Sequence, residues 1–363
     1  MNPMAWSVVD IEDNLLLGKM DTIAMPPDTV VDAINRAESV LGHEWVASES
    51  RAKGLAPTMG IVGIGRRLVS LEGVRSSEEL IKKIRCGDPS ADAELTAIYL
   101  FRSHDPLLEL ELFPSVGSRI ADFRLRKGEE QWTTVEVTRP DISKEQERLG
   151  GILRRISGAL GSIDSQFALE VILRREPTFD EIALLCDHLP EFCRLTGPQR
   201  ASLKDEVGFL LLNHAPVGHL PHSAIPEIAE VPMIGLGVFF SDDRVVNVRI
   251  PFSDDRASRL LGAEAEQLPR GGRGLVMISG PASANELNVW TPLIQRRLQP
   301  RIHTRVSGVC LFEGAMRPIA NRYDWLVQAN LVVNPYAKVA LPSWVQTAVT
   351  IASEACTRCG EAG

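Results

Sequence analysis

SRIADFRLRKGEEQWTTVEVTRP, residues 118–140, is the stretch that decides the fold predicted for this chain. Two runs with strand-forming residues flank the polar turn Lys127–Glu130, which predicts an antiparallel hairpin. Each run contains one acid, Asp122 in the first and Glu136 in the second. A carboxylate is unfavourable inside a strand unless a cation or a hydrogen-bond donor meets it. These two acids are therefore the first candidates for a functional site.

The elements around the hairpin predict an αβββαβ core within residues 88–174. A helix should begin at Asp88-Pro89, because aspartate caps helix N-termini and proline is favoured in the first turn. This helix carries Glu94 in its second turn. The remaining predicted elements are strands Leu107–Phe113, Arg119–Arg126 and Gln131–Thr138, helix Ser143–Leu160 and strand Gln166–Leu173.

The length of 363 residues exceeds the usual size of a single hydrophobic core. We expect a mixed α/β protein with a helical region at 1–87 and the αβββαβ core with its continuation at 88–215. A C-terminal α/β extension at 232–345 and a tail at 346–363 should follow. The tail contains one CxxC pair, Cys356 and Cys359, and a single pair makes a poor zinc site.

The composition is that of an ordinary soluble globular protein, with 44% apolar and 24% charged residues. No apolar run is long enough to cross a bilayer, so we expect no membrane partner. Acids at Asp10, Glu12 and Asp13 stand where a signal peptide would be basic and then apolar. The six cysteines show no disulfide rhythm. Together these features predict a cytoplasmic protein.

Side chains alternate between the two faces of a strand, so the hairpin should bring Asp122 and Glu136 together on one side. Two converging carboxylates repel each other unless a divalent cation lies between them. The backbone carbonyl of Val137 and the carboxylate of Glu94 would add two further oxygen ligands. A site of this kind suits Mg²⁺ or Mn²⁺.

This arrangement resembles the PD-(D/E)xK nuclease superfamily, which has the restriction-endonuclease-like fold. Glu94 corresponds to the helix acid of the family, Asp122 to the second-strand aspartate, and Glu136-Val137-Thr138 to the (D/E)-x-K tripeptide. The resemblance implies a metal-dependent nuclease that hydrolyses phosphodiester bonds of DNA or RNA with Mg²⁺ or Mn²⁺. Glu94, Asp122, Glu136 and Thr138 would be its catalytic residues.

Two positions depart from the family pattern. Ala121 replaces a proline, and Thr138 replaces the lysine, whose ammonium group orients the attacking water. Arg124 and Lys144 are the candidates for a substitute cation. One alternative is a catalytically degenerate nuclease-fold module that binds nucleic acid or protein. Another is a surface hairpin whose carboxylates pair with Arg124, Arg126 or Lys127.

The charge of the chain is unevenly distributed around a net value of −8. This value argues against broad non-specific binding of nucleic acid, but not against a local basic surface. No acid lies between Glu286 and Glu313. The basic residues of this interval are candidates for substrate contact, namely Arg296, Arg297 and Arg301, followed by Arg305.

Two further motifs allow other interpretations. The segment His214–His222 contains three histidines, which would permit a zinc hydrolase built on His214, His219 and His222. The glycines of Gly60–Gly65 superficially suggest a nucleotide-binding loop. This segment lacks the Walker lysine and no strand precedes it, so close packing of helices is the better interpretation.

Overall fold

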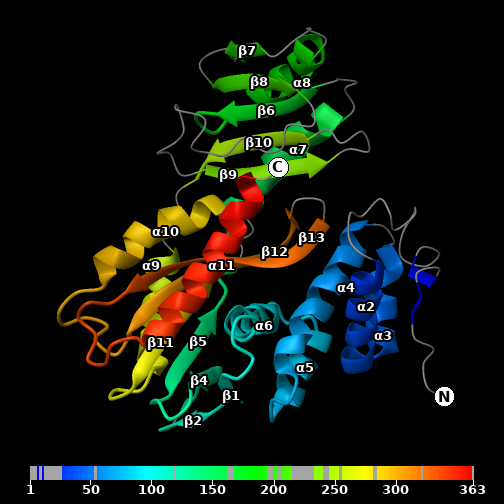
Figure 1. The fold of residues 1–363 in the computed structure, drawn as a ribbon. Coiled ribbons are helices and arrows are strands. Elements are labelled where there is room, and N and C mark those ends of the chain that lie inside the picture. The colour runs from blue at the N-terminus through cyan, green and yellow to red at the C-terminus, as the bar shows by residue number, and fades with distance from the viewer. Residues whose placement is uncertain are drawn as a thin grey trace. The chain divides into compact units, whose positions relative to one another are not determined.

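The structure, a computed structural model, describes residues 6–7, 10–11, 27–52, 55–117, 119–141, 143–161, 167–193, 199–202, 207–214, 233–239, 245–252, 256–280, 284–319 and 322–361. The chain is mixed α/β, as the sequence predicts. It divides into two compact units. Unit 1 combines residues 1–140 with 255–363, and unit 2 is the segment 141–254 between them (Figure 1).

The expected helical N-terminal region is present. Gly65 lies where helices α2 and α4 meet, and a Cβ there would collide with the backbone carbonyl of Ala33. The glycines of Gly60–Gly65 lie within α4, so they form no loop and at Gly65 they serve close helix packing. The helices of this region are α2 (Pro27–Leu41), α3 (His43–Glu49), α4 (Leu55–Leu68) and α5 (Ser77–Arg85), with short 3₁₀ turns at Ser50–Ala52 and Val69–Leu71.

A six-stranded mixed sheet forms the centre of unit 1, in the order β1-β4-β5-β11-β12-β13. The strands β5, β11 and β12 are parallel to one another, and the other neighbours pair antiparallel. A two-stranded ribbon of β2 (Ser115–Val116) and β3 (Arg119–Ile120) precedes β4. The bounds of the sheet strands are β1 Glu109–Leu112, β4 Phe123–Arg126, β5 Thr133–Thr138, β11 Arg273–Ser279, β12 Gly308–Ile319 and β13 Arg322–Val333.

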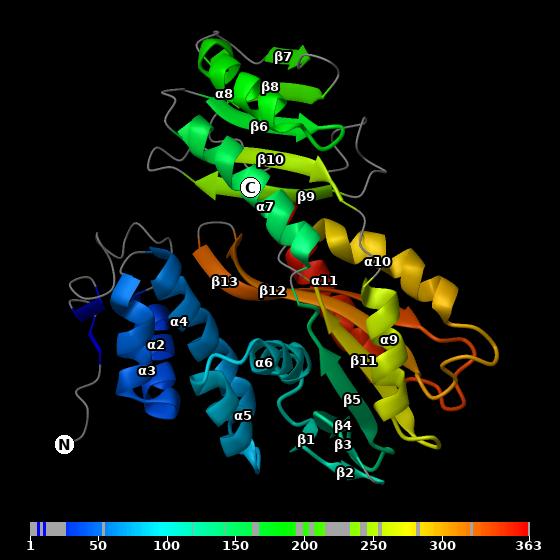
Figure 2. The same ribbon diagram turned by 180° about the vertical axis from the view of Figure 1, so that it is seen from behind.

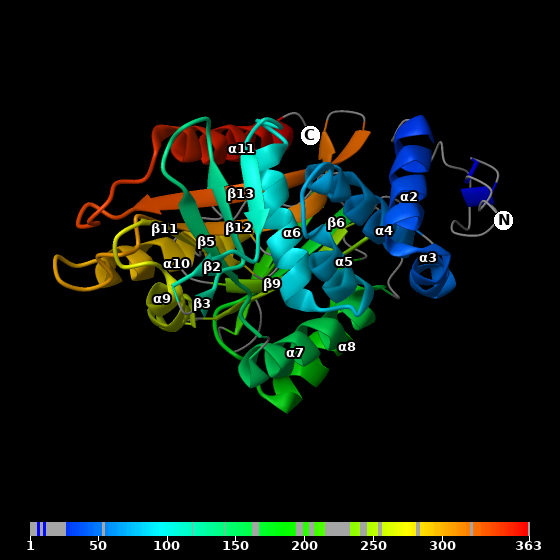
Figure 3. The same ribbon diagram turned by 90° about the horizontal axis from the view of Figure 1, so that it is seen from below.

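Helices cover both faces of this sheet. Side chains alternate along β11, so Leu275 and Met277 pack on one face while Val276 and Ile278 pack on the other. The first face contacts α6 (Pro89–Arg102) and α11 (Ser343–Glu361), and the second contacts α9 (Arg256–Gln267) and α10 (Ala284–Arg297). Figures 2 and 3 show α11 on one side of the strands and α9 and α10 on the other.

The expectation that strand 166–173 completes the core sheet is wrong. This strand, β6 (Phe167–Leu173), pairs with strands of unit 2. The parallel neighbour of β5 is β11, preceded by α9 rather than by the helix predicted at 143–160. The sequences of β6 and β11 are both apolar and both suit a buried strand. Consecutive elements are usually neighbours in space, so sequence order favours β6 as the partner of β5.

Unit 2 has its own five-stranded sheet, in the order β7-β8-β6-β10-β9. Glu170 on β6 and Arg249 on β10 form a buried ion pair at 2.5 Å within it. The further elements of this unit are α7 (Lys144–Gly161), α8 (Phe179–Cys193), β7 (Gln199–Ser202), β8 (Gly208–His214), β9 (Met233–Phe239) and β10 (Val245–Pro251).

The division predicted at 88–215 and 232–345 differs from these units, because unit 1 takes strands from both parts of the chain. The predicted tail at 346–363 is also wrong. Residues up to 361 continue α11, which buries Val345, Ala348 and Val349 against the sheet. The side chains of Cys356 and Cys359 lie outside the described residues. None of the described helices has the length and apolar character needed to span a membrane.

Candidate functional site

The predicted hairpin is confirmed, with β4 and β5 antiparallel and Phe123 paired with Val135. One step further along this register, Asp122 stands opposite Glu136. Asp122 lies just before β4, where the regular ladder ends. The hairpin therefore brings the two acids together, as the sequence predicts.

Asp122 replaces a ladder hydrogen bond with its own side chain. Its Oδ2 accepts a hydrogen bond from the backbone N–H of Val137 at 2.7 Å. The backbone N–H of Asp122 in turn donates to the carboxylate of Glu136. Because the N–H and C=O of one residue lie on the same edge of a strand, the carbonyl of Val137 faces the same side as Asp122. Burial raises the pKa of Asp122, while the Val137 hydrogen bond and Lys83 act to lower it.

Glu94 is positioned by α6, which begins where predicted. Asp88 caps this helix by accepting from the backbone N–H of Ser90 at 2.9 Å. The Glu94 side chain is buried, and its Oε1 lies 3.2 Å from Nζ of Lys83. Burial, and then the charge of Asp122, raise the pKa of Glu94 to about 7, against the lowering effect of Lys83.

Glu136 is buried as deeply as Glu94, with 2% of its surface exposed. Within the described residues its Oε1 has no hydrogen-bond partner. Burial, Asp122 and Glu264 raise the pKa of Glu136 to about 8, opposed by the hydrogen bond from Asp122 and by Arg119. A buried carboxylate oxygen without a donor is costly unless a proton or a cation meets it.

Glu264 is a fourth acid that the sequence analysis missed. It lies in the third turn of α9 and accepts hydrogen bonds from the Thr138 hydroxyl and, at 2.7 Å, from Nε2 of Gln267. Burial and then Asp122 raise the pKa of Glu264, while these hydrogen bonds lower it. Thr138, which stands at the position of the family lysine, is thus hydrogen-bonded to an acid that follows unit 2 in the sequence.

Three basic side chains of the hairpin, Arg124, Arg126 and Lys127, pair with acids outside this group. Nη2 of Arg124 lies 2.5 Å from Oε2 of Glu111, and Cζ of Arg124 lies 4.5 Å from the ring centre of Trp132. Arg126 and Lys127 pair with other acids of unit 1. The alternative in which these three cations neutralise Asp122 and Glu136 is therefore wrong. Arg124, a predicted substitute for the missing lysine, is likewise occupied by Glu111.

The other predicted substitute, Lys144, begins α7 in unit 2. The ammonium group that does reach the acids belongs to Lys83, on α5. It pairs with Glu94 and lies 4.7 Å from the ring centre of Phe113. Phe113 has a positive φ of 50°, a strained conformation for this residue, and donates its N–H to the carbonyl of Asp122.

Sequence signals for Lys83 and Glu264 exist but are weak. Lys83 precedes the buried Ile84, and Glu264 precedes the buried Ala265, so each lies at the border of an apolar helix stripe. Such a position is usual for surface charges as well. Only the pairing of β11 with β5 identifies α9 as a neighbour of the hairpin.

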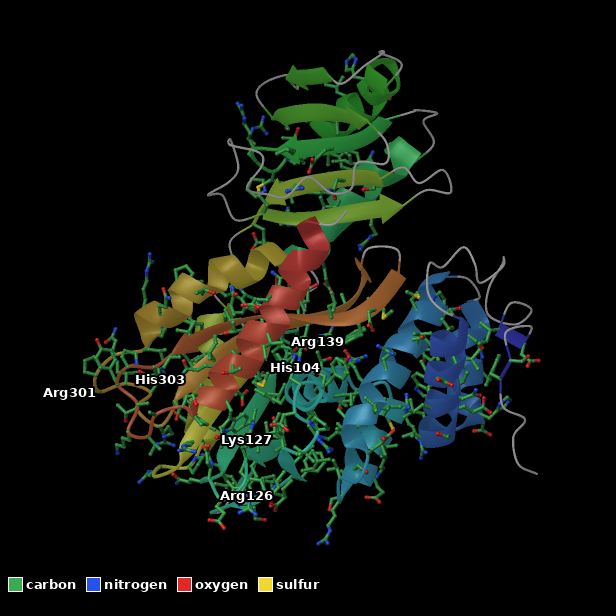
Figure 4. The ribbon with its side chains drawn as sticks, in the orientation of Figure 1. His104, Arg126, Lys127, Arg139, Arg301 and His303 are labelled. Atoms are coloured by element: carbon green, nitrogen blue, oxygen red, sulfur yellow. The ribbon has the colours of Figure 1, made fainter. Side chains whose placement is uncertain are left out.

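The basic interval 296–305 lies at the end of α10 and in the following loop (Figure 4). Arg305 is used structurally, because it donates to the carbonyls of Glu266 and Leu268 at the end of α9. Four other basic side chains of this interval and of the loop at 334–340 are exposed: Arg296, Arg297, Arg301 and Lys338. Among the described residues, none of these four forms an ion pair with a carboxylate. The exposed ring of Tyr336 lies in the same loop as Lys338. We call these five residues the basic patch.

Among the described residues, no three acids, histidines or cysteines stand close enough to share a metal ion as arranged here. His219 and His222 lie outside the described residues, as does the side chain of His214. The comparisons give no relative: no protein-family model matches the chain, and neither a curated protein nor a solved structure is significantly similar to it.

Proposed function

We propose that this chain is a metal-dependent nuclease-like protein that hydrolyses phosphodiester bonds of DNA or RNA with Mg²⁺ or Mn²⁺. The observation that carries the proposal is the acid group around Asp122, in which Glu136 presents a buried oxygen that has no hydrogen-bond partner in the described part of the chain. The order α6-β1-β4-β5-α9-β11 supports it, because it repeats the helix and strand order of the PD-(D/E)xK core with unit 2 inserted.

The donor set fits a hard divalent cation, since it consists of carboxylate oxygens and one backbone carbonyl. Asp122, Glu136 and the carbonyl of Val137 would hold the ion, with Glu94 beside them. A bound ion would lower the pKa of a water and neutralise charge on a phosphate. Neutralisation of these acids by a cation would also remove the repulsion between Asp122 and Glu136.

The chain supplies two polar groups beside the acids. Lys83 holds a positive charge beside Glu94 that also acts on Asp122, and it comes from α5 rather than from the position of the family lysine. The Thr138 hydroxyl is a hydrogen-bond donor that carries no charge. The basic patch supports nucleic acid as the partner, because its exposed cations, Arg296, Arg297 and Arg301 with Lys338, match a phosphate backbone.

Cleavage by the full-length protein tests the proposal directly. Plasmid DNA, single-stranded DNA and RNA are incubated with Mn²⁺, Mg²⁺ or EDTA. We expect cutting that requires the metal and falls at least 100-fold in Asp122→Asn and Glu136→Gln. Glu129→Gln, in the exposed hairpin turn, is the matched control and should cut normally. Equal cutting by Glu136→Gln and the wild type would refute the proposal.

A second candidate is a catalytically degenerate nuclease-fold module that binds nucleic acid or protein. The observation in its favour is that Thr138 replaces the lysine and is already bonded to Glu264. This candidate predicts binding that persists in EDTA and a Thr138→Lys variant without activity. Metal-dependent cutting by the wild type would exclude it.

A further inference from the structure

Glu264 lies on α9, which follows unit 2 in the sequence. Three observations define its position in the acid group. It lies in a helix that packs on β5 and β11, it accepts from the Thr138 hydroxyl, and it accepts from Gln267. Thr138 and Glu136 are two residues apart on β5, so their side chains project from the same face about 6–7 Å apart. Glu264 therefore lies on the face of the sheet that Glu136 occupies.

The countercharges of the group are unequally distributed. Glu94, on the other side of Asp122, has the ammonium of Lys83 at 3.2 Å. Among the described residues, no lysine or arginine forms an ion pair with Glu136 or Glu264; Arg119 acts on Glu136 only from a distance. The carboxyl groups of Glu136 and Glu264, which lack an ion-pair partner in the described part of the chain, thus lie between β5 and α9.

The unpartnered oxygen of Glu136 identifies this region as incomplete. A side chain that is 98% buried, with one carboxylate oxygen lacking any donor in the described part of the chain, needs a further partner. Glu264, Thr138 and Gln267 are polar groups beside it. Glu264 is the only one of these three with a negative charge to offer a cation.

We propose that Glu264 is a ligand of the divalent cation of this site, and that Mg²⁺ or Mn²⁺ is held by Glu264 together with Glu136 and Asp122. This inference rests on the function proposed above. It replaces Glu94 by Glu264 in the set of metal ligands, because Glu94 already forms an ion pair with Lys83. In the arrangement described, Glu264 is turned to Thr138 and Gln267. Binding exchanges those two hydrogen bonds for the cation.

The position of Arg119 and Arg305 supports this role. Both donate to the backbone carbonyl of Glu266, Arg119 at 2.6 Å and Arg305 at 3.1 Å. Positive charge at a helix C-terminus is stabilising and holds the last turn in place. The two arginines thereby fix the end of α9 that carries Glu264.

The test measures Mn²⁺ affinity of the full-length protein by electron paramagnetic resonance of the free ion. We expect Glu264→Gln to weaken binding at least tenfold and Glu264→Asp to weaken it by a smaller factor. Glu266→Gln is the matched control, because it removes an exposed carboxylate two residues along the same helix and should bind within twofold of the wild type. Glu94→Gln should weaken binding less than Glu264→Gln.

Circular dichroism and thermal melting in EDTA establish that each variant is folded, and Glu264→Asp keeps the test valid if Glu264→Gln is not. Wild-type affinity in both Glu264 variants, with loss in Glu136→Gln, would overturn the role of Glu264 and leave the proposed function standing. Glu264-dependent binding without cutting of any nucleic acid would overturn the function and leave the cation site standing. No Mn²⁺ binding by the wild type would overturn the site itself.

Discussion

Glu136 places a carboxylate in a strand that is covered by helices on both faces. The pKa of its carboxyl group is raised from 4.5 to about 8, first by burial and then by the neighbouring acids Asp122 and Glu264. Without a cation the group is protonated in the folded protein at neutral pH, whereas it is ionised in the unfolded chain. Folding therefore takes up a proton, which couples stability to pH.

The sign of this coupling predicts that the metal-free protein loses stability as the pH rises. The contribution of Glu136 is fully present below pH 4.5 and is lost as the pH rises through about 8; Glu94, with a pKa of about 7, adds to the same loss. Glu136→Gln should flatten this dependence and raise Tm at pH 8, by roughly 1–2 °C per kcal/mol of repulsion relieved. Melting in EDTA from pH 5.5 to 8.5 checks this.

Glu129→Gln is the control for that series and should follow the wild-type profile, because its side chain is exposed. A wild-type Tm that rises between pH 6 and 8.5 would contradict the prediction. Addition of Mn²⁺ should raise Tm more at pH 8 than at pH 6, since protons compete with the cation for the same oxygens.

At the residue scale, contacts that depend on local backbone geometry could be predicted from the sequence. Asp122 and Glu136 could be paired because a short turn fixes the register of the hairpin. The substitute cation could not be predicted correctly. Arg124 has the right position in sequence, but Glu111 on the adjacent strand binds it, and no local pattern distinguishes that pair from a pair with Asp122.

At the scale of elements, the contact of α2 with α4 depends on one missing side chain. Gly65→Ala should destabilise the protein by about 1–3 kcal/mol, because the added methyl would collide with the carbonyl of Ala33. Gly60→Ala is the matched control in the same helix, with nothing near its Cβ position. It should be neutral or stabilising by about 0.5–1 kcal/mol. Urea unfolding of both variants measures the difference.

Equal stability of the two glycine variants would mean that α2 and α4 do not meet at Gly65. The helical N-terminal region itself was predicted from apolar periodicity, which is reliable for a single amphipathic helix. The fourth strand of the core was not, because Phe167–Leu173 and Arg273–Ser279 are both short, apolar and preceded by a helix. Periodicity identifies a strand but not its neighbour.

The basic patch gives the element-scale prediction for substrate contact. The double variant Arg296→Ala and Arg297→Ala should weaken binding of nucleic acid and reduce the slope of log affinity against log salt by about 1–2, because up to two phosphate contacts are lost. Arg126→Ala, which removes a cation paired with Glu109, is the control and should retain the wild-type slope. An unchanged slope in the double variant would place the nucleic acid elsewhere.

At the scale of the whole molecule, the four acids of the group all belong to unit 1. Glu94, Asp122 and Glu136 precede unit 2 in sequence, and Glu264 follows it. Addition of Mn²⁺ should therefore slow amide hydrogen exchange in β5 and α9 while leaving β6 and β10 unchanged. Exchange of the full-length protein, followed by mass spectrometry with and without the ion, measures this. Equal protection in both units would contradict it.

The mixed α/β class was predicted from composition and alternating elements, and it is confirmed. The two-unit division was not predicted, because an insertion leaves no mark in the periodicity of the elements on either side. Glu264 could not be assigned to the site for the same reason. Its neighbours in sequence are those of an ordinary surface helix, and its neighbours in space come from a segment more than a hundred residues away.

The pairing of Thr133 with Arg273 across unit 2 also constrains the order of folding. On the ribosome β5 emerges long before β11. The edge of β5 that pairs with β11 therefore has no partner strand while residues 141–254 are synthesised. Contacts of such sequence separation form slowly, and an unsatisfied strand edge is prone to join other chains. We expect unit 2 to fold first and the newly made protein to depend on chaperones until β11 is released.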